Sequence, residues 1–239
     1  MMIKYFSFLI IMAFALFMMP GCGSDCKKGS GNMTTENRKV ANFTKLDISG
    51  GFKISIKQDT GASLSITTDD NLIKDIQADV SGDKLTLKAN NGKCTSGVIM
   101  VNITVKNLSD IKTLGTVDLV SNGKLTIQDL SLNLAGVSKI DFDLSAGNVV
   151  IGSSGIANVM LKGQASSNAV DFSGSGTLTA FDFIVGKYTL NSSGQSHCQI
   201  NVLNELNVSS SGASQVEYKG NPSTIKNNKA GASSLKKVD

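Results

Sequence analysis

The fold is decided by residues 155–193, GIANVMLKGQASSNAVDFS followed by GSGTLTAFDFIVGKYTLNSS, in which one pattern occurs twice. In each half a glycine, Gly155 or Gly174, is followed four residues later by an apolar side chain, Val159 or Leu178. The same pairing recurs at intervals of 18 to 21 residues: Gly115/Leu119, Gly136/Ile140, Gly155/Val159, Gly174/Leu178, Gly194/Cys198, Gly212/Val216 and Gly231/Leu235. A fixed period of this size predicts a solenoid, in which each repeat forms one coil.

The residues after each glycine alternate with the period of a β-strand. The fourth residue is apolar in every repeat, whereas the third is polar: Asp118, Lys139, Asn158, Thr177, His197, Gln215 and Ser234. Because successive side chains of a strand point to opposite faces, Cys198 is predicted to lie in the core and His197 on the outside. The glycine is predicted to form the corner before the strand, where a positive φ is easiest without a Cβ.

These features predict an all-β fold, a right-handed parallel β-helix. A repeat of about nineteen residues is long enough for a closed coil of about 60 Å, at about 3.3 Å per residue. The slippage of the period argues against a left-handed helix built on hexapeptides. A β-sandwich remains the structural alternative.

The N-terminus predicts export. Lys4 precedes an apolar run over residues 5–19, which is too short to span a bilayer as a helix, and a small, polar stretch follows. Residues 19–22, MPGC, resemble a bacterial lipobox, so we expect residues 1–21 to be a lipoprotein signal peptide and Cys22 to carry the lipid, including palmitate. Gly23 implies, by resemblance to lipoprotein sorting rules, the outer membrane, and the leaflet is left open.

Composition divides the mature chain into three parts. Residues 22–42 are expected to form a flexible tether, residues 43–108 irregular N-terminal coils that cap the solenoid, and residues 109–239 regular coils. Turns are expected at Gly50-Gly51 and other glycine-rich points, and 71–78 is expected to be a short helix or an irregular connection. The N-terminal strands are expected near 43–48, 52–56, 64–68, 84–88 and 98–105. At the other end, Lys226, Lys229, Lys236 and Lys237 are expected to discourage end-to-end pairing.

Five short motifs carry a family resemblance: 43–56 (FTKLDISGGFKISI), 82–87 (GDKLTL), 161–165 (LKGQA), 173–176 (SGSG) and 218–222 (YKGNP). Across residues 43–235 the chain resembles the putative auto-transporter adhesin head domain family, also called the head GIN domain. The resemblance implies a right-handed parallel β-helix in a secreted or lipid-anchored bacterial protein. It implies no catalytic or ligand-binding residues.

The four cysteines are expected to have different roles. With Cys22 lipidated and Cys198 in the core, Cys26 and Cys94 remain. They are either bridged, which would fasten the tether to the first coils, or free, because connectivity cannot be read from sequence.

Enzyme chemistry has weak support, and neither a cofactor nor a metal site is expected. His197 is the only histidine and points away from Cys198. Asp141 and Asp143 share one face, as a paired-carboxylate mechanism in a polysaccharide-active enzyme would require. The other candidates for that chemistry are Asp118, Asp171, Lys139 and Lys162. Exposed carboxylates on a strand more often serve solubility.

Two other functions are open. The exposed sheets could bind a glycan or a protein as an adhesion or interaction module, or the coils could be a structural or assembly unit of the cell envelope. Aromatic residues, at 5%, are few for a carbohydrate site. A formal net charge of +4 with scattered basic residues does not predict nucleic-acid binding.

Overall fold

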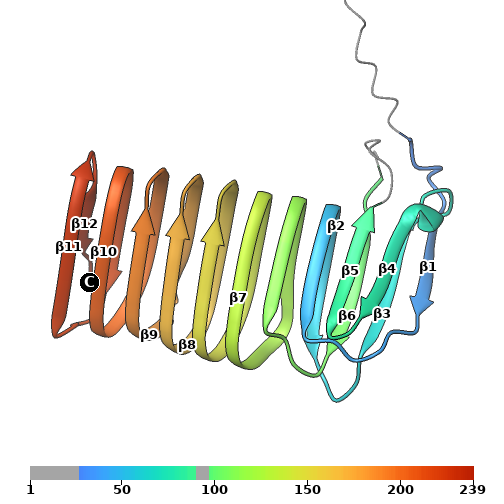
Figure 1. Ribbon diagram of the computed structural model, residues 1–239, viewed down its shortest axis with the longest axis horizontal. Coiled ribbons are helices and arrows are strands. Elements are labelled where there is room, and N and C mark those ends of the chain that lie inside the picture. Colours follow the sequence, from blue (N-terminus) through green and yellow to red (C-terminus); the bar gives the residue numbers. More distant parts are fainter. Residues whose placement is uncertain (1–26, 90–96) are drawn as a thin grey trace, which may run out of the picture.

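The computed structural model describes residues 27–89 and 97–239, and it is the predicted β-solenoid. Figure 1 shows the coils stacked side by side along one axis, with the N-terminal strands at one end and the C-terminus at the other. None of the helices in the described ranges is long and apolar enough to cross a bilayer. The expected signal peptide, Cys22, Cys26 and Cys94 lie outside the described residues.

The regular coils are parallel throughout, and their pairing shifts register after Met160, Ile200 and Val202. β7 (Asp110–Ser153) is followed by β8 (Ile156–Phe172), β9 (Ser175–Ser192), β10 (Gln195–Lys219), β11 (Thr224–Gly231) and β12 (Ser234–Lys237). Val159 pairs with Leu178 and Leu178 with Cys198, so the apolar column read from the sequence is one continuous stack. Cys198 is fully buried, as predicted.

The corner glycines stack directly on one another. A Cβ on Gly155 would lie 2.0 Å from the carbonyl oxygen of Gly136, and one on Gly174 would lie 2.2 Å from the carbonyl oxygen of Gly155. The expectation that a positive φ explains these glycines holds for Gly136, with φ +84°, but Gly155 and Gly174 do not have one. Close approach of successive coils is the requirement that they share.

The N-terminal strands do not stack in chain order. β2 (Lys45–Gln58) pairs with β7 on one side and with β5 (Lys84–Ala89) and β6 (Met100–Val105) on the other. In Figure 1 the blue β2 therefore lies between green strands. The turn expected at Gly50-Gly51 is a corner within β2, not a loop between two strands. Gly50 pairs with Gly115 and extends the glycine stack by one coil.

Antiparallel strands close the N-terminal end. β3 (Ser63–Asp69) pairs with β6, β4 (Ile76–Ser81) pairs with β5, and a short 3-10 helix, η2 (Ile73–Asp75), joins them. The region 71–78 is thus a short helix that runs into a strand. Reversal of direction at this end interrupts the parallel ladder that would otherwise continue.

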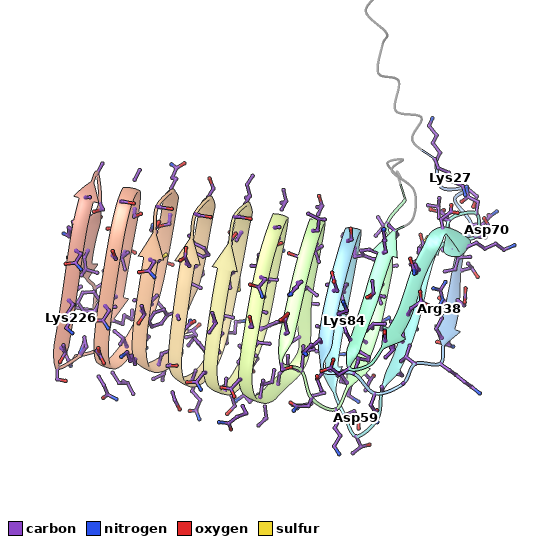
Figure 2. The ribbon with its side chains drawn as sticks, in the orientation of Figure 1. Lys27, Arg38, Asp59, Asp70, Lys84 and Lys226 are labelled. Carbon is purple, nitrogen blue, oxygen red and sulfur yellow. The ribbon has the colours of Figure 1, made fainter. Side chains whose placement is uncertain are left out.

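The outermost strand corrects the predicted tether. β1 (Met33–Arg38) pairs with β3, so the expected flexible segment 22–42 contains a strand. The Arg38 guanidinium donates hydrogen bonds to the carbonyl oxygens of Ile76, at 2.6 Å, and Ile73, at 3.2 Å. Figure 2 shows Arg38 at this capped end and Lys226 at the other. Arg38 thereby fastens β1 to the start of β4.

The core is a single apolar cluster that runs along the solenoid from Phe43 to Val216. The side chains of Asn168 and Tyr188 are buried in it, and the Asn168 amide donates a 2.7 Å hydrogen bond to the Tyr188 hydroxyl. At the C-terminal end, β11 is exposed along its whole length. Lys229 stacks on Ser210, a buried residue of the preceding coil, and so places a charge at the edge of the last coil.

Candidate binding surface

The sheet that follows the corner glycines presents two rows of solvent-facing side chains. We call it the first sheet. It comprises β6, residues 51–58 of β2, residues 116–122 and 137–143 of β7, the N-terminal parts of β8, β9 and β10, residues 213–219 of β10, and β12. Row one holds the residue directly after each glycine: Gly51, Thr116, Val137, Ile156, Ser175, Gln195, Ala213 and Ala232. Row three holds the third residue: Lys53, Asp118, Lys139, Asn158, Thr177, His197, Gln215 and Ser234.

The C-terminal half of the first sheet is hollowed between these rows. The depression has a volume of about 530 Å³ and runs from Ile156 in β8 to Ser234 in β12. Small residues, including Ala157, Gly176 and Ser214, keep it shallow and even. Its lining contains no Asp, Glu, Lys or Arg. We call this depression the uncharged groove.

The N-terminal half of the same sheet carries both apolar and charged side chains. A second depression, of about 370 Å³, lies over Gly51, and its lining includes Val98 and Val137. No atom lies within 4 Å of the position that a Cβ on Gly51 would take. Large hydrophobic side chains are exposed on this half and on the adjoining β8, and we call them the apolar patch: Val98, Met100, Val120, Val137, Ile156 and Met160.

Sequence reasoning missed the apolar patch. It compared the third and fourth residues after each glycine and took the outer face to be polar. The available signal was in row one, where Val137 and Ile156 directly follow corner glycines and are 46% and 56% exposed. Large exposed apolar side chains gathered on one face mark an interaction surface more often than scattered ones do.

Three of the candidate catalytic residues lie together in one depression on the first sheet, and the other three lie outside it. Asp118, Lys139 and Asp141 line a depression of about 340 Å³ on the first sheet. Asp143 lies beyond it, 3.9 Å from the Lys124 ammonium. Lys162 stacks on Asp143 in the next coil.

Asp171 lies on a different sheet, between Gly152 and Asn191 of the neighbouring coils. His197 faces outward from row three, opposite the buried Cys198, as predicted. Within residues 27–89 and 97–239, no group of three His, Cys, Asp or Glu side chains is placed to hold a metal ion.

A different sheet, which we call the second sheet and which contains residues 148–153, 167–172 and 187–192, carries its own polar ladder. The Asn148 amide donates to Asp129 and accepts from the Ser167 hydroxyl, both at 2.7 Å. Further along, Lys187 lies 3.2 Å from Glu205. The hydrogen bond from the Asn207 amide, with Lys187 beside it, lowers the pKa of Glu205 below its ordinary value. Side chains of this sheet therefore bond to one another across coils.

The sequence of residues 42–222 matches the family described as putative auto-transporter adhesin, head GIN domain. The chain belongs to this family. The resemblance stated from the short motifs is thereby confirmed, and the match covers both the rearranged N-terminal coils and the regular coils of this head GIN domain. A search of the curated proteins found no match.

Solved structures share the fold of this head GIN domain over most of its length. A putative adhesin from Bacteroides fragilis is 25% identical, with a TM-score of 0.85 over 89% of this chain and 100% of its own. A putative lipid binding protein from Parabacteroides distasonis is 20% identical, with a TM-score of 0.73 over 89% and 99% of the two chains. A putative adhesin from Parabacteroides merdae is 19% identical, with a TM-score of 0.71 over 90% and 100%.

Proposed function

We propose that this head GIN domain is a lipid-anchored, non-catalytic interaction module of the bacterial cell envelope that binds an extended, uncharged glycan. The uncharged groove is the observation that carries this proposal. It crosses successive coils of β8, β9, β10 and β12 without a charged side chain in its lining. A ligand with ionised groups would find no counter-charge there.

The side chains of row three suit hydroxyl groups. The amide of Gln215 and the hydroxyl of Thr177 both donate and accept hydrogen bonds, as sugar hydroxyls do, and the ring of His197 lies between them. Coils follow one another at about 4.8 Å, so a polymer lying along the axis would meet one such side chain per coil. Individually weak contacts repeated in this way add up to useful affinity.

Of the four candidate carboxylates, only Asp118 and Asp141 share a depression. A glycosidase needs two carboxyl groups on either side of one bond, at most about 9.5 Å apart. Asp171 is a residue of the second sheet. Asp143 lies beside Lys124, outside the depression that Asp118 and Asp141 share. Turnover of a glycan that is abolished by Asp141→Asn would overturn the non-catalytic assignment.

The anchor rests on the sequence around Cys22, and the location rests on the family. A cleaved signal peptide that ends before Cys22 would leave the lipid at the start of the mature chain, ahead of β1. Family and solved relatives are described as adhesins, which supports an exported protein at the cell surface. The outer membrane is our proposal for the membrane that holds the lipid.

The test compares two triple variants of the full chain, solubilised in mild detergent, on an array of neutral and anionic glycans. Thr177→Ala, His197→Ala and Gln215→Ala together remove the polar wall of the uncharged groove. The matched control, Thr189→Ala, Asn191→Ala and Asn207→Ala, removes similar side chains from the second sheet. We expect retention of neutral glycans to fall at least tenfold in the first variant alone. Equal losses in both variants, or binding only to anionic glycans, would contradict the proposal. Binding of an extended peptide and of no glycan would show that the ligand is a protein segment.

A further inference from the structure

We propose that the apolar patch is the interface of a two-fold homodimer, in which Ile156 of each copy enters the depression over Gly51 of the other and Asp118 meets Lys139. This interface goes beyond the proposed glycan binding; it is centred on β2 and β7 and shares the β8 end of the uncharged groove, including Ile156, with that proposal. It rests on a match of shape and charge that a single symmetry axis satisfies.

The shape match joins one exposed side chain to one hole. Ile156 is 56% exposed and stands in row one of β8. Gly51 stands in the same row, in β2, and the space above it is open. Gly51 pairs with Thr116 in the first coil of β7, and Ile156 pairs with Val137 in the second coil of β7. The depression over Gly51 and the Ile156 side chain therefore lie on the two coils that flank these coils of β7.

The charge match follows from the same geometry. Asp118 shares a coil with Thr116, and Lys139 shares the next coil with Val137. A two-fold axis parallel to the strands, lying in the interface midway between these two coils, exchanges them between the copies. It brings Asp118 opposite Lys139 and, one coil further out on each side, Gly51 opposite Ile156. Symmetry makes each contact twice, as in any self-complementary interface.

The remaining positions of the two rows are compatible with this axis. In row one Thr116 comes opposite Val137, and in row three Lys53 comes opposite the neutral Asn158. No two like charges of rows one and three therefore meet. Two sheets packed face to face with nearly aligned strands are a common arrangement.

The area suits a dimer of modest affinity. From β6 to the start of β9 the coils cover about 29 Å at about 4.8 Å per coil, and the strands are about 20 Å long at about 3.3 Å per residue. Two such faces bury about 1,200 Å² together, which is the lower limit of the usual range for specific interfaces. We therefore expect dissociation in the micromolar range. Because Ile156 and Asn158 also line the uncharged groove, the dimer covers the β8 end of that groove.

The charge pair gives the sharpest test, by sedimentation equilibrium of the full chain in density-matched detergent up to about 100 μM. Asp118→Lys or Lys139→Asp alone places like charges together twice, and we expect at least a tenfold weaker dimer. The double variant restores opposite charges and should return to within about threefold of the unaltered protein. A monomer at the highest concentration, or a double variant that stays folded but dissociated, would overturn the dimer.

Two further comparisons test the shape match and the sheet. Gly51 has no positive φ and free space at its Cβ position, so Gly51→Leu fills the hole without strain and should abolish dimerisation. Val137 and Val150 are 46% and 49% exposed but face different sheets. Val137→Asp should dissociate the dimer, and Val150→Asp should leave it intact. The melting temperatures of these two variants should be equal. Equal effects of the two valine variants, or a dimer that survives Gly51→Leu, would refute the interface.

Discussion

Gly176 lies directly against the ring of Phe172 inside the corner where the chain passes from β8 to β9. A Cβ on Gly176 would be 2.3 Å from Cδ2 of Phe172, closer than any real contact. Phe172 is fully buried, and Gly176 occupies the inward position two residues after the corner glycine. A large side chain before the corner thus requires the smallest one after it.

Gly176→Ala should therefore destabilise the fold. Overpacking of this kind costs about 1–3 kcal/mol, which chemical denaturation would measure. Phe172→Leu in the same chain should recover part of the loss, because the ring is the group in contact. Gly152→Ala is the matched control, since the nearest atom to its Cβ position is 3.8 Å away. A cost for Gly152→Ala equal to that of Gly176→Ala would refute the packing argument.

The hydrogen bond between Asn168 and Tyr188 predicts an asymmetric double-mutant cycle. Tyr188→Phe leaves the buried Asn168 amide without its acceptor and should cost about 1–3 kcal/mol of unfolding free energy. Adding Asn168→Leu removes the stranded amide, so the double variant should be more stable than Tyr188→Phe alone. Strictly additive losses, measured by urea denaturation, would show that the two side chains are not coupled.

The buried thiol of Cys198 predicts sensitivity to alkali. Burial raises the pKa of Cys198 from 9.0 to about 12. Above pH 9 the unfolded chain loses this proton while the folded chain keeps it, so the thiol's contribution is intact below pH 9 and is lost as the pH rises toward 12.

The slope of unfolding free energy against pH, between pH 9 and 11, measures this effect. Cys198→Val should make the slope shallower by about 1.4 kcal/mol per pH unit. Valine suits the position because Val216 occupies the same column of the solenoid. Identical slopes in the two proteins would show that the thiol ionises as readily in the fold as outside it.

Lipid attachment predicts a change of cell fraction. Cys22→Ser should release the full chain from the membrane fraction and abolish incorporation of labelled palmitate, because the acylated residue is gone. Cys26→Ser, four residues further on, is the control and should stay membrane-bound and labelled. Labelling that survives Cys22→Ser would show that the lipid is attached to another residue.

The sequence was most informative where the coils are regular. Alternation after each glycine placed Cys198 inside and His197 outside, because strand geometry couples neighbouring residues to opposite faces. The pattern could not reveal that position 155 requires a glycine because the Gly136 backbone comes so close to it. In a sequence, a glycine required for that reason looks the same as one required for a positive φ.

The N-terminal half was harder to predict for a different reason. Alternation identifies which face of a strand is buried but not which strand lies beside it. Gly50-Gly51 has the composition of a turn, although its backbone continues β2 beside β7. The polar residues of β1 have no apolar period, and their pairing with β3 is set by distant backbone. Val137 and Ile156 are an interface signal only once their exposure is known.

The position of β2 also constrains when the domain can fold during synthesis. Lys45–Gln58 leaves the ribosome early, but its neighbours are β5 and β6 on one side and the first turn of β7 on the other. On one side β2 is not fully paired until Val105 has emerged and on the other until Ser121 has emerged, and contacts of such long sequence separation form slowly. β2 must therefore wait for these later residues before it is paired on both sides, which keeps this segment threadable through an export channel until the coils that hold it have followed.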